Sequence, residues 1–600
     1  MTSIVTSMST AQIAALSTKQ IAALSTTDIA ALSTSQAGVL STAQIAALST
    51  ADVVSLSTAA IAAFNASQLK ALGADDVASL ATAQVAALSS SQVTAFSTAQ
   101  IAAMTTSQVG ALAGNMSTAQ INVLSTAQIA GVSTTTMAAL STTQLAAIST
   151  KDIAALSTAQ LSAVSTTNLA ALSTAQITAM TTAQVGALAA NMSTTQIGAL
   201  TTAQTAGLTT TVISSLATAQ LQAISTKDIA ALSTTQAAGL STTVLGNLTA
   251  AQLKAIETKD IAAMSTTQLG ALTTTQVGTL ATAQLAALSS TQIGSLGAKL
   301  STGQISALTT TQVAGVSTTT MAALSTAQLA AISTKDIAAL STTQLGAVST
   351  TNLAALTTAQ ITAMTTTQVG ALAGSMSTAQ IGVLTTAQTA GLTTTVIGAL
   401  ATAQLQAIST KDIAALSTTQ AAGLSTTVLG NLTAAQLKAI ETKDIAAMST
   451  TQLGALTTTQ VGTLATAQLA ALSSTQIGSL GAKLSTGQIS ALTTTQVAGV
   501  STTTMAALST AQLAAISTKD IAALSTAQLS AVSTTNLAAL STAQITAMTT
   551  AQVGALAANM STTQIGALTT AQTAGLTTTV ISSLATAQLQ AISTKDIAAL

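Results

Sequence analysis

Residues 9–48 read STAQIAAL, STKQIAAL, STTDIAAL, STSQAGVL and STAQIAAL, and octads of this kind continue to Leu600. Position 1 of the octad is Ser or Thr, position 2 is usually Thr, and position 4 is usually Gln or Asp. Positions 5 and 8 are aliphatic, and positions 6 and 7 are mostly Ala or Gly. Since repetition at a fixed period marks one structural unit per repeat, the octad decides the fold.

Three backbone conformations can be tested against a period of eight. On one continuous α-helix, at about 100° per residue, the apolar pair moves about 80° round the rod with each octad, so no face stays buried. In a strand, positions 5 and 8 point to opposite sides, and Ala and Gln are poor strand residues. A β-solenoid with Thr-rich rungs remains an open alternative. The third possibility is a helix that stops and restarts in every octad.

The start of each octad has the pattern of a helix N-terminus. The segment STAQ at 9–12 is a capping box, in which the Ser hydroxyl accepts from the N3 amide and the Gln side chain returns to the N-cap amide. Leu16 before the next cap and Ile21 beyond it form a hydrophobic staple. Where Asp replaces Gln, as in STTD at 25–28, a negative charge lies in the first turn, where the helix dipole favours it.

These signals predict an all-α solenoid of very short capped helices, one per octad, each of about six residues. So short a helix is unstable alone, because nucleation costs more than one turn returns, so the helices must stack. The aliphatic residues at 5 and 8 are predicted to fill a continuous interior, while Ala or Gly at 6 and 7 lets backbones approach closely. The representative capping and core residues are Ser9, Gln12, Ile13, Leu16, Ser25, Asp28, Ile29 and Leu32.

We divide the chain into an N-terminal start, residues 1–8, and a continuous solenoid, residues 9–600. Six insertions of four residues interrupt the octads, near 113, 189, 297, 373, 481 and 557. Their starts are separated alternately by 76 and 108 residues, so a longer period of 184 lies over the octad. Each insertion is predicted to extend a helix by about one turn; it is either simply tolerated or a kink or lateral contact point. Blocks 133–232 and 501–600 differ only at Thr143 against Ala511, which suggests duplication within a longer chain.

A charged octad, STKDIAAL, recurs with the rhythm of the insertions. Its Lys and Asp are adjacent and do not face each other on one helix. They form either a solubilising point on the outer face or a lateral contact, in which Lys of one coil meets Asp of another. The candidate lateral contacts are Lys151, Asp152, Lys227, Asp228, Lys335 and Asp336.

The composition excludes most chemistry. The 600 residues include no Cys, His, Trp, Tyr, Pro or Arg, and 14 Lys balance 14 acidic residues. Thiolate and imidazole catalysis and the usual zinc sites are therefore ruled out, and no basic stripe would bind nucleic acid. We predict no catalytic, cofactor-binding or metal-binding residue. At 48% hydrophobic and 5% charged the chain must fold, and neither a transmembrane segment nor a cleaved secretory signal can be read from it.

The octads at 9–16, 41–48 and 125–132 resemble octapeptide tracts of very large repetitive surface or secreted proteins of Gram-negative bacteria, often described as adhesin-like. The resemblance covers nearly the whole chain and implies an extracellular or cell-surface location. It also implies export by one-step type I secretion, although neither a terminal export signal nor Gly/Asp-rich calcium nonapeptides are present.

Four functions compete on this evidence. The first is a non-enzymatic structural protein that self-associates into a filament, stalk or sheath. The second is a binding module, an array of Ser and Thr hydroxyls facing ice, polysaccharide or another surface. A scaffold for partner proteins lacks the usual Arg, Trp and Tyr anchors. An enzyme would have to use the only dense charges, Asp75 with Asp76 and Glu257 with Lys259 and Asp260, which are more simply surface charges at helix starts.

Overall fold

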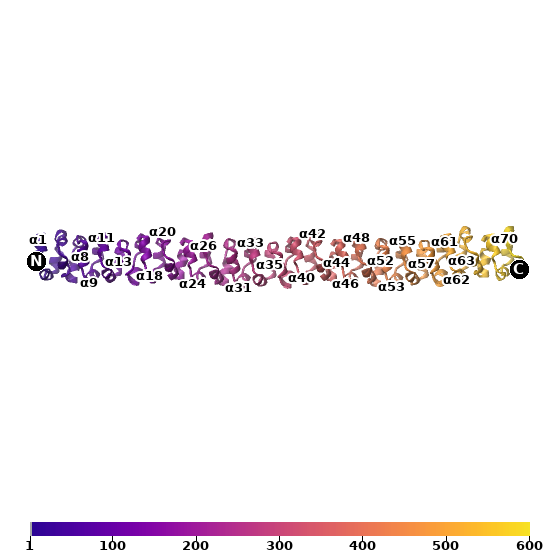
Figure 1. The fold of residues 1–600 in the computed structure, drawn as a ribbon, viewed down its shortest axis with the longest axis horizontal. Helices are drawn as coiled ribbons and strands as arrows, with labels where there is room; N and C mark the ends of the chain where they lie inside the picture. Colours follow the sequence, from indigo (N-terminus) through magenta and orange to yellow (C-terminus); the bar gives the residue numbers. More distant parts are fainter. Residues whose placement is uncertain (1–2) are drawn as a thin grey trace. The chain divides into compact units, whose positions relative to one another are not determined.

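The computed structural model describes residues 3–600 and divides them into two compact units, residues 1–300 and 301–600. Within the described residues there are 71 α-helices, seven 3₁₀-helices and no strand. The predicted all-α fold of one short helix per octad is confirmed, and the β-solenoid alternative is wrong. Within each unit, helices of rising number follow one another along a common direction (Figure 1).

The helix bounds follow the octad. Every α-helix begins at position 2, from α1 (Thr10–Ala14) to α71 (Thr594–Ile597), and most end at position 6 or 7. The helices that precede an insertion run on to position 8: α13 (Thr106–Leu112), α22 (Thr182–Leu188), α35 (Ser290–Leu296), α44 (Thr366–Leu372), α57 (Ser474–Leu480) and α66 (Thr550–Leu556). The 3₁₀-helices are η1 (Ile4–Ser7), η2 (Ala113–Asn115), η3 (Ala189–Asn191), η4 (Gly297–Lys299), η5 (Ala373–Ser375), η6 (Gly481–Lys483) and η7 (Ala557–Asn559).

The predicted capping boxes are present. The Ser9 amide donates to Gln12 Oε1 at 2.8 Å, and the Gln12 amide donates to Ser9 Oγ at 3.3 Å. In α3 (Thr26–Ala30), the Ser25 amide and hydroxyl donate to Asp28 Oδ2 at 3.3 and 2.6 Å. Most helices therefore begin at a Ser or Thr N-cap, as the sequence predicts, whereas a few begin at Ala, Asn, Gly or Glu, as at Ala81 and Glu257.

The core is formed by positions 5 and 8. Ile13, Ile29 and Leu32 are buried, as predicted. Leu16 is only half-buried, against expectation, because it lies in the first turn of the coil, which no earlier turn covers. For the same reason Gln12 and Gln20 are exposed, whereas the corresponding Gln in most later octads is buried.

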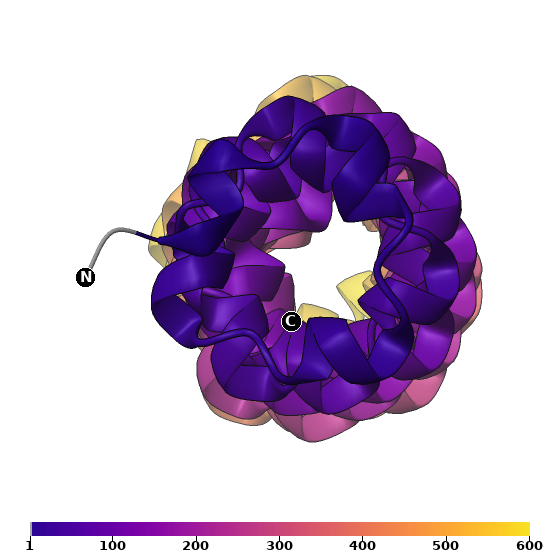
Figure 2. The same cartoon turned by 90° about the vertical axis from the view of Figure 1, so that its left-hand side faces the viewer.

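Most helices pack against the helix three places along the chain, and α25 (Thr210–Ser215) also contacts α29 (Thr242–Asn247), four places along. α1 contacts α4 (Thr34–Gly38), and α9 (Ala74–Ser79) contacts α12 (Thr98–Ala103). Side chains of each octad also bond to the octad four places earlier, as described below. One turn of the coil therefore holds between three and four helices, a number that the sequence did not predict. Seen end-on, the first helices of the chain, in indigo, lie around one axis (Figure 2).

Each four-residue insertion occupies the place of a whole octad in the coil. Gln120 Nε2 donates to the carbonyls of Val93 and Phe96, both at 2.8 Å, and these lie 27 and 24 residues back. Away from insertions the corresponding separations are 31 and 28. Both separations are shorter by four residues because the four-residue insertion stands in place of a full octad. The 3₁₀-helix η2 therefore occupies the place of one helix in the coil. We call each four-residue insertion a half repeat.

Glycine at position 7 accommodates a close approach between turns of the coil, both after half repeats and elsewhere, as at Gly239. The second octad after every half repeat has Gly at position 7, as in Gly131, Gly207 and Gly391. A Cβ on Gly207 would lie 2.7 Å from Thr182 Cγ2, and one on Gly391 would lie 2.7 Å from Thr366 Cγ2. At position 6, by contrast, a Cβ on Gly186 would meet nothing within 4 Å. The predicted close approach is therefore tightest at position 7; at position 6 it occurs in some octads, as at Gly198, whose Cβ would lie 3.2 Å from a backbone oxygen.

Candidate functional site

Glutamine at position 4 joins successive turns of the coil. Gln44 Oε1 accepts from the Ser41 amide at 2.7 Å, which completes its own helix cap. Gln44 Nε2 donates to the carbonyls of Ile13 at 3.0 Å and Leu16 at 2.7 Å, four octads earlier. Each such amide thus caps the start of one helix and pairs the carbonyls at the end of another. We call this series the glutamine ladder.

In the interior of the molecule, the Gln side chains of the ladder have hydrogen-bond partners for both the amide oxygen and the amide nitrogen. Gln68 and Gln108 are each 1% exposed, and both amides are bonded at both ends. A buried amide without partners would be costly, as would helix-end carbonyls shielded from water. Sequence reasoning found only the capping end of these side chains. The preference for Gln over Glu at position 4 was the available signal, because Glu caps equally well but cannot donate.

Aspartate at position 4 makes a different contact. Asp152 is 6% exposed, and its Oδ2 accepts from the Ser149 hydroxyl at 2.6 Å. Its Oδ1 accepts from the hydroxyl of Thr126, three octads earlier, at 2.8 Å. The same Thr-to-Asp bond joins Thr202 to Asp228 at 2.7 Å.

This placement corrects the prediction that Lys and Asp share the outer face. Asp152, Asp228 and Asp336 are all buried, with carboxylates bonded to hydroxyls of their own chain. They are not available to the lysine of another coil. Lys151, Lys227 and Lys335 are outside, and whether they meet a neighbouring molecule stays a prediction.

Hydrogen bonds from hydroxyl groups also lower the pKa of two aspartates. Hydrogen bonds from the Ser25 and Ser3 hydroxyls, together with the Ile4 amide, lower the pKa of Asp28 to about 2. Bonds from the Ser593 and Thr570 hydroxyls lower the pKa of Asp596. A lowered folded-state pKa stabilises the fold above the unfolded value, and this contribution is lost as the pH falls through the folded value. For Asp28, that loss lies between about pH 4 and pH 2.

Surface hollows lie at three of the octads that carry Asp. One hollow of about 500 Å³ is lined by Gly198, Leu200, Lys227 and Asp228. Its counterpart, of about 550 Å³, is lined by Gly382, Leu384, Lys411 and Asp412. The third, of about 500 Å³, lies between octads 117–124 and 149–156. In each, the octad that carries Asp meets the octad four places earlier, where a Gln amide would otherwise reach the carbonyls. The hollows admit water to those carbonyls.

The candidate catalytic charges form no constellation in the described part of the chain. Glu257 and Lys259 make an exposed ion pair at 2.5 Å, which raises the pKa of Lys259. Asp76 instead accepts from Thr50 at 3.0 Å and from the Gly73 amide, and so belongs to the coil. Residues 3–600 contain no group of three or more acidic side chains placed to hold a metal ion. No helix among them is long and apolar enough to cross a membrane.

Comparison with known proteins gives one family. The model of the ALTTAQ repeat matches ten stretches, some of them overlapping, that together cover more than half of the chain. They are residues 21–50, 45–82, 77–113, 153–190, 245–282, 253–290, 317–350, 337–373, 429–474 and 521–558. No curated protein matches the chain.

Proposed function

We propose that this chain, which belongs to the ALTTAQ repeat family, is a non-enzymatic structural protein that forms a filament, stalk or sheath. The observation that carries the proposal is the repeating contact pattern. Octads along the chain contact neighbours three places away, and Gln bonds to the octad four places earlier recur along most of the coil. Such a chain has no preferred length, because its stability is a sum over neighbouring repeats.

The surface supports the same function. Charged residues make up 5% of the chain, with no net charge, and positions 1 to 3 of the octads are mostly exposed Ser, Thr and Ala. Weak electrostatic repulsion favours side-by-side packing of such chains. The resemblance to repetitive bacterial surface proteins supports an extracellular or cell-surface location. Antibody labelling of intact cells of the source organism tests the location.

Electron microscopy with helical averaging tests the structural function. Residues 217–300 and 401–484 are identical, so deletion of residues 217–400 removes one 184-residue period without disturbing the octads. We expect rods or fibres, with the single-chain length shortened by about three tenths in the deletion variant. Compact globules, or equal lengths for both proteins, would contradict the proposal.

The binding alternative rests on the exposed hydroxyls at positions 2 and 3. The hydroxyl at position 1 supports it less, because it is bonded within the helix cap. An ice-recrystallisation assay and a polysaccharide-binding assay test this alternative. If neither assay shows an effect, the binding alternative is excluded, and the proposed structural function is unaffected.

A further inference from the structure

The glutamine ladder is interrupted repeatedly over residues 209–264 of the first unit. Alternate octads there carry Val212, Asp228, Val244 and Asp260 at position 4. Neither valine nor an ionised aspartate can donate to a carbonyl. The helices concerned are α25 (Thr210–Ser215), α27 (Thr226–Ala230), α29 (Thr242–Asn247) and α31 (Thr258–Ala262).

The next stretch, residues 265–300, has a donor at every step. Gln268 donates to the Leu240 carbonyl at 2.7 Å, and Gln292 donates to Met264 at 2.7 Å. Gln276 and Gln284 make the corresponding bonds, both within 3.2 Å. In the half repeat, Lys299 Nζ takes over and donates to the Leu272 carbonyl at 2.7 Å. The two stretches therefore differ in the bonds that hold one turn to the next.

The contrast recurs in the second unit. Residues 393–448 carry Val396, Asp412, Val428 and Asp444 at the same places, and residues 449–484 again have a donor at every step. The Thr-to-Asp bonds offset part of the loss at Asp228 and Asp260, but they join octads three places apart. Hollows beside Asp228 and Asp412 also admit water between the turns.

We infer that residues 209–264 and 393–448 are opening segments, at which the coil separates first under tension or thermal fluctuation. Local opening starts where few bonds hold a region and where water already reaches the backbone. The intact stretches 265–300 and 449–484 then remain as closed blocks. Asp52, Ala60 and Asp76 interrupt the ladder in the same way, so residues 49–80 are a third opening segment. The inference does not depend on where the protein resides or what it binds.

Hydrogen exchange measured by mass spectrometry on the full chain is the first test. Peptides from 217–264 are identical to those from 401–448, and peptides from 265–300 are identical to those from 449–484. Each peptide therefore reports both units at once. We expect the backbone amides of 217–264 to exchange at least about fivefold faster than those of 265–296, since one hydrogen bond changes local opening by roughly this factor. Equal rates would overturn the inference.

A variant that restores the donors sharpens the test. Val212→Gln, Asp228→Gln, Val244→Gln and Asp260→Gln together complete the ladder of residues 209–264 and leave its counterpart at 393–448 unchanged. The changed masses distinguish this stretch from its unaltered copy at 401–448. We expect exchange to slow about fivefold for each restored bond in the altered copy and to stay unchanged in the other. No slowing, or equal slowing in both copies, would overturn the inference.

The matched control places Gln one residue earlier, where the side chains are exposed: Thr211→Gln, Lys227→Gln, Thr243→Gln and Lys259→Gln. This variant is expected to leave exchange unchanged, and slowing equal to that of the restored variant would count against the inference. Single-molecule stretching adds an independent measurement. At about 3.6 Å per residue, each of the two 56-residue opening segments holds about 200 Å of extended chain, so each should give an early step of up to that length. The four-Gln variant should lose one such step, whereas rupture with no early steps in the unaltered chain would contradict the inference.

Discussion

The half repeats Ala373–Met376 and Gly481–Leu484 shorten the coil equally but secure it differently. In the first half repeat, Ala373 has a helical backbone conformation, with φ at −49°. None of the four side chains of this half repeat donates in the way that a Gln at position 4 does in a full octad. In the second, Lys483 Nζ donates to the carbonyls of Gly454 at 2.5 Å and Leu456 at 2.8 Å, four steps back. A lysine three residues into the half repeat thus performs the task of a glutamine at position 4. A glycine begins this type, and its counterpart Gly297 lies at φ 37°, where other residues are strained.

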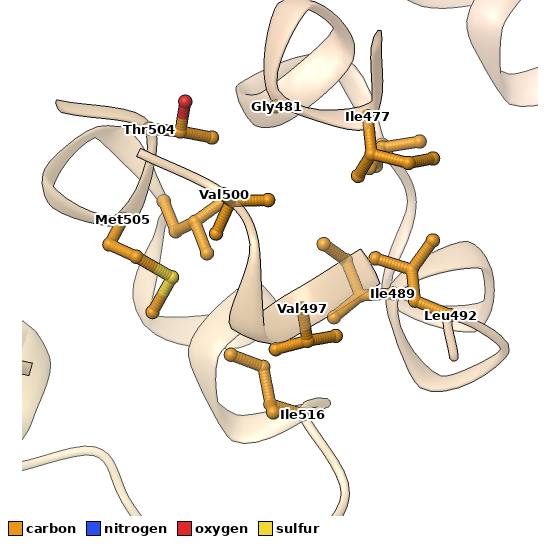
Figure 3. A pocket seen from close by; sticks show the side chains of 11 residues that line it. Ile477, Gly481, Ile489, Leu492, Val497, Val500, Thr504, Met505 and Ile516 are labelled. Atoms are coloured by element: carbon orange, nitrogen blue, oxygen red, sulfur yellow. The ribbon is translucent and has the colours of Figure 1, made fainter. Parts of the chain in front are cut away.

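The same two places differ in the core of the second octad downstream. After the first half repeat, Thr389 is fully buried and its Oγ1 has no hydrogen-bond partner. After the second, the corresponding residue is Val497, beside an apolar cavity of about 20 Å³ that also borders Ile489 and Met505 (Figure 3). One site therefore retains an unpaired hydroxyl and the other a small void.

Lys483→Met should produce the largest change. It removes a charged donor from two half-buried carbonyls, which we expect to cost about 2 kcal/mol. Hydrogen exchange is the appropriate measurement, since long repeat arrays do not unfold in one step. The peptide that contains residue 483 is identified by its mass, and the Lys299 copy is the internal control. Exposed Lys438→Met should have no effect, and equal effects of the two substitutions would refute the role of Lys483.

Gly391→Ala should have the second largest effect. The new Cβ would lie 2.7 Å from Thr366 Cγ2, and such overpacking costs roughly 1–2 kcal/mol. Gly370→Ala is the matched control, because its Cβ would meet nothing within 4 Å. In that helix alanine should slow exchange slightly through its better helix propensity. If Gly391→Ala and Gly370→Ala changed the exchange rate in the same direction, the close approach of Gly391 to Thr366 would be disproved.

Thr389→Val should have the smallest effect, and it should be stabilising. It removes the unpaired buried hydroxyl and keeps the shape of the side chain, with a gain of about 1 kcal/mol. The second octad after Ala373–Met376 would then carry Val at this position, as the chain already does at Val497 after Gly481–Leu484. Slower exchange in the peptide spanning residue 389 is the expected result. Faster exchange would mean that the hydroxyl has a stabilising role.

Local features of the fold could be predicted because their signals lie within one octad. The capping boxes at Ser9 and Ser25 and the core residues Ile13 and Ile29 follow from spacing alone. The second bond of Gln44 could not be predicted, because its acceptors lie 28 to 31 residues away and depend on the number of helices per turn. The burial of Asp152 was missed for the same reason, since its Thr126 partner is 26 residues away. The half repeats were visible as insertions, but their role as full steps required the geometry of the coil.

The glutamine ladder gives the coil a polarity. The Gln amides of the ladder all donate toward earlier octads, so a break within the ladder leaves free amide donors on one fracture surface and free carbonyls on the other. A donor surface complements an acceptor surface, whereas two like surfaces do not pair. A severed coil can therefore re-anneal head to tail, in a single orientation.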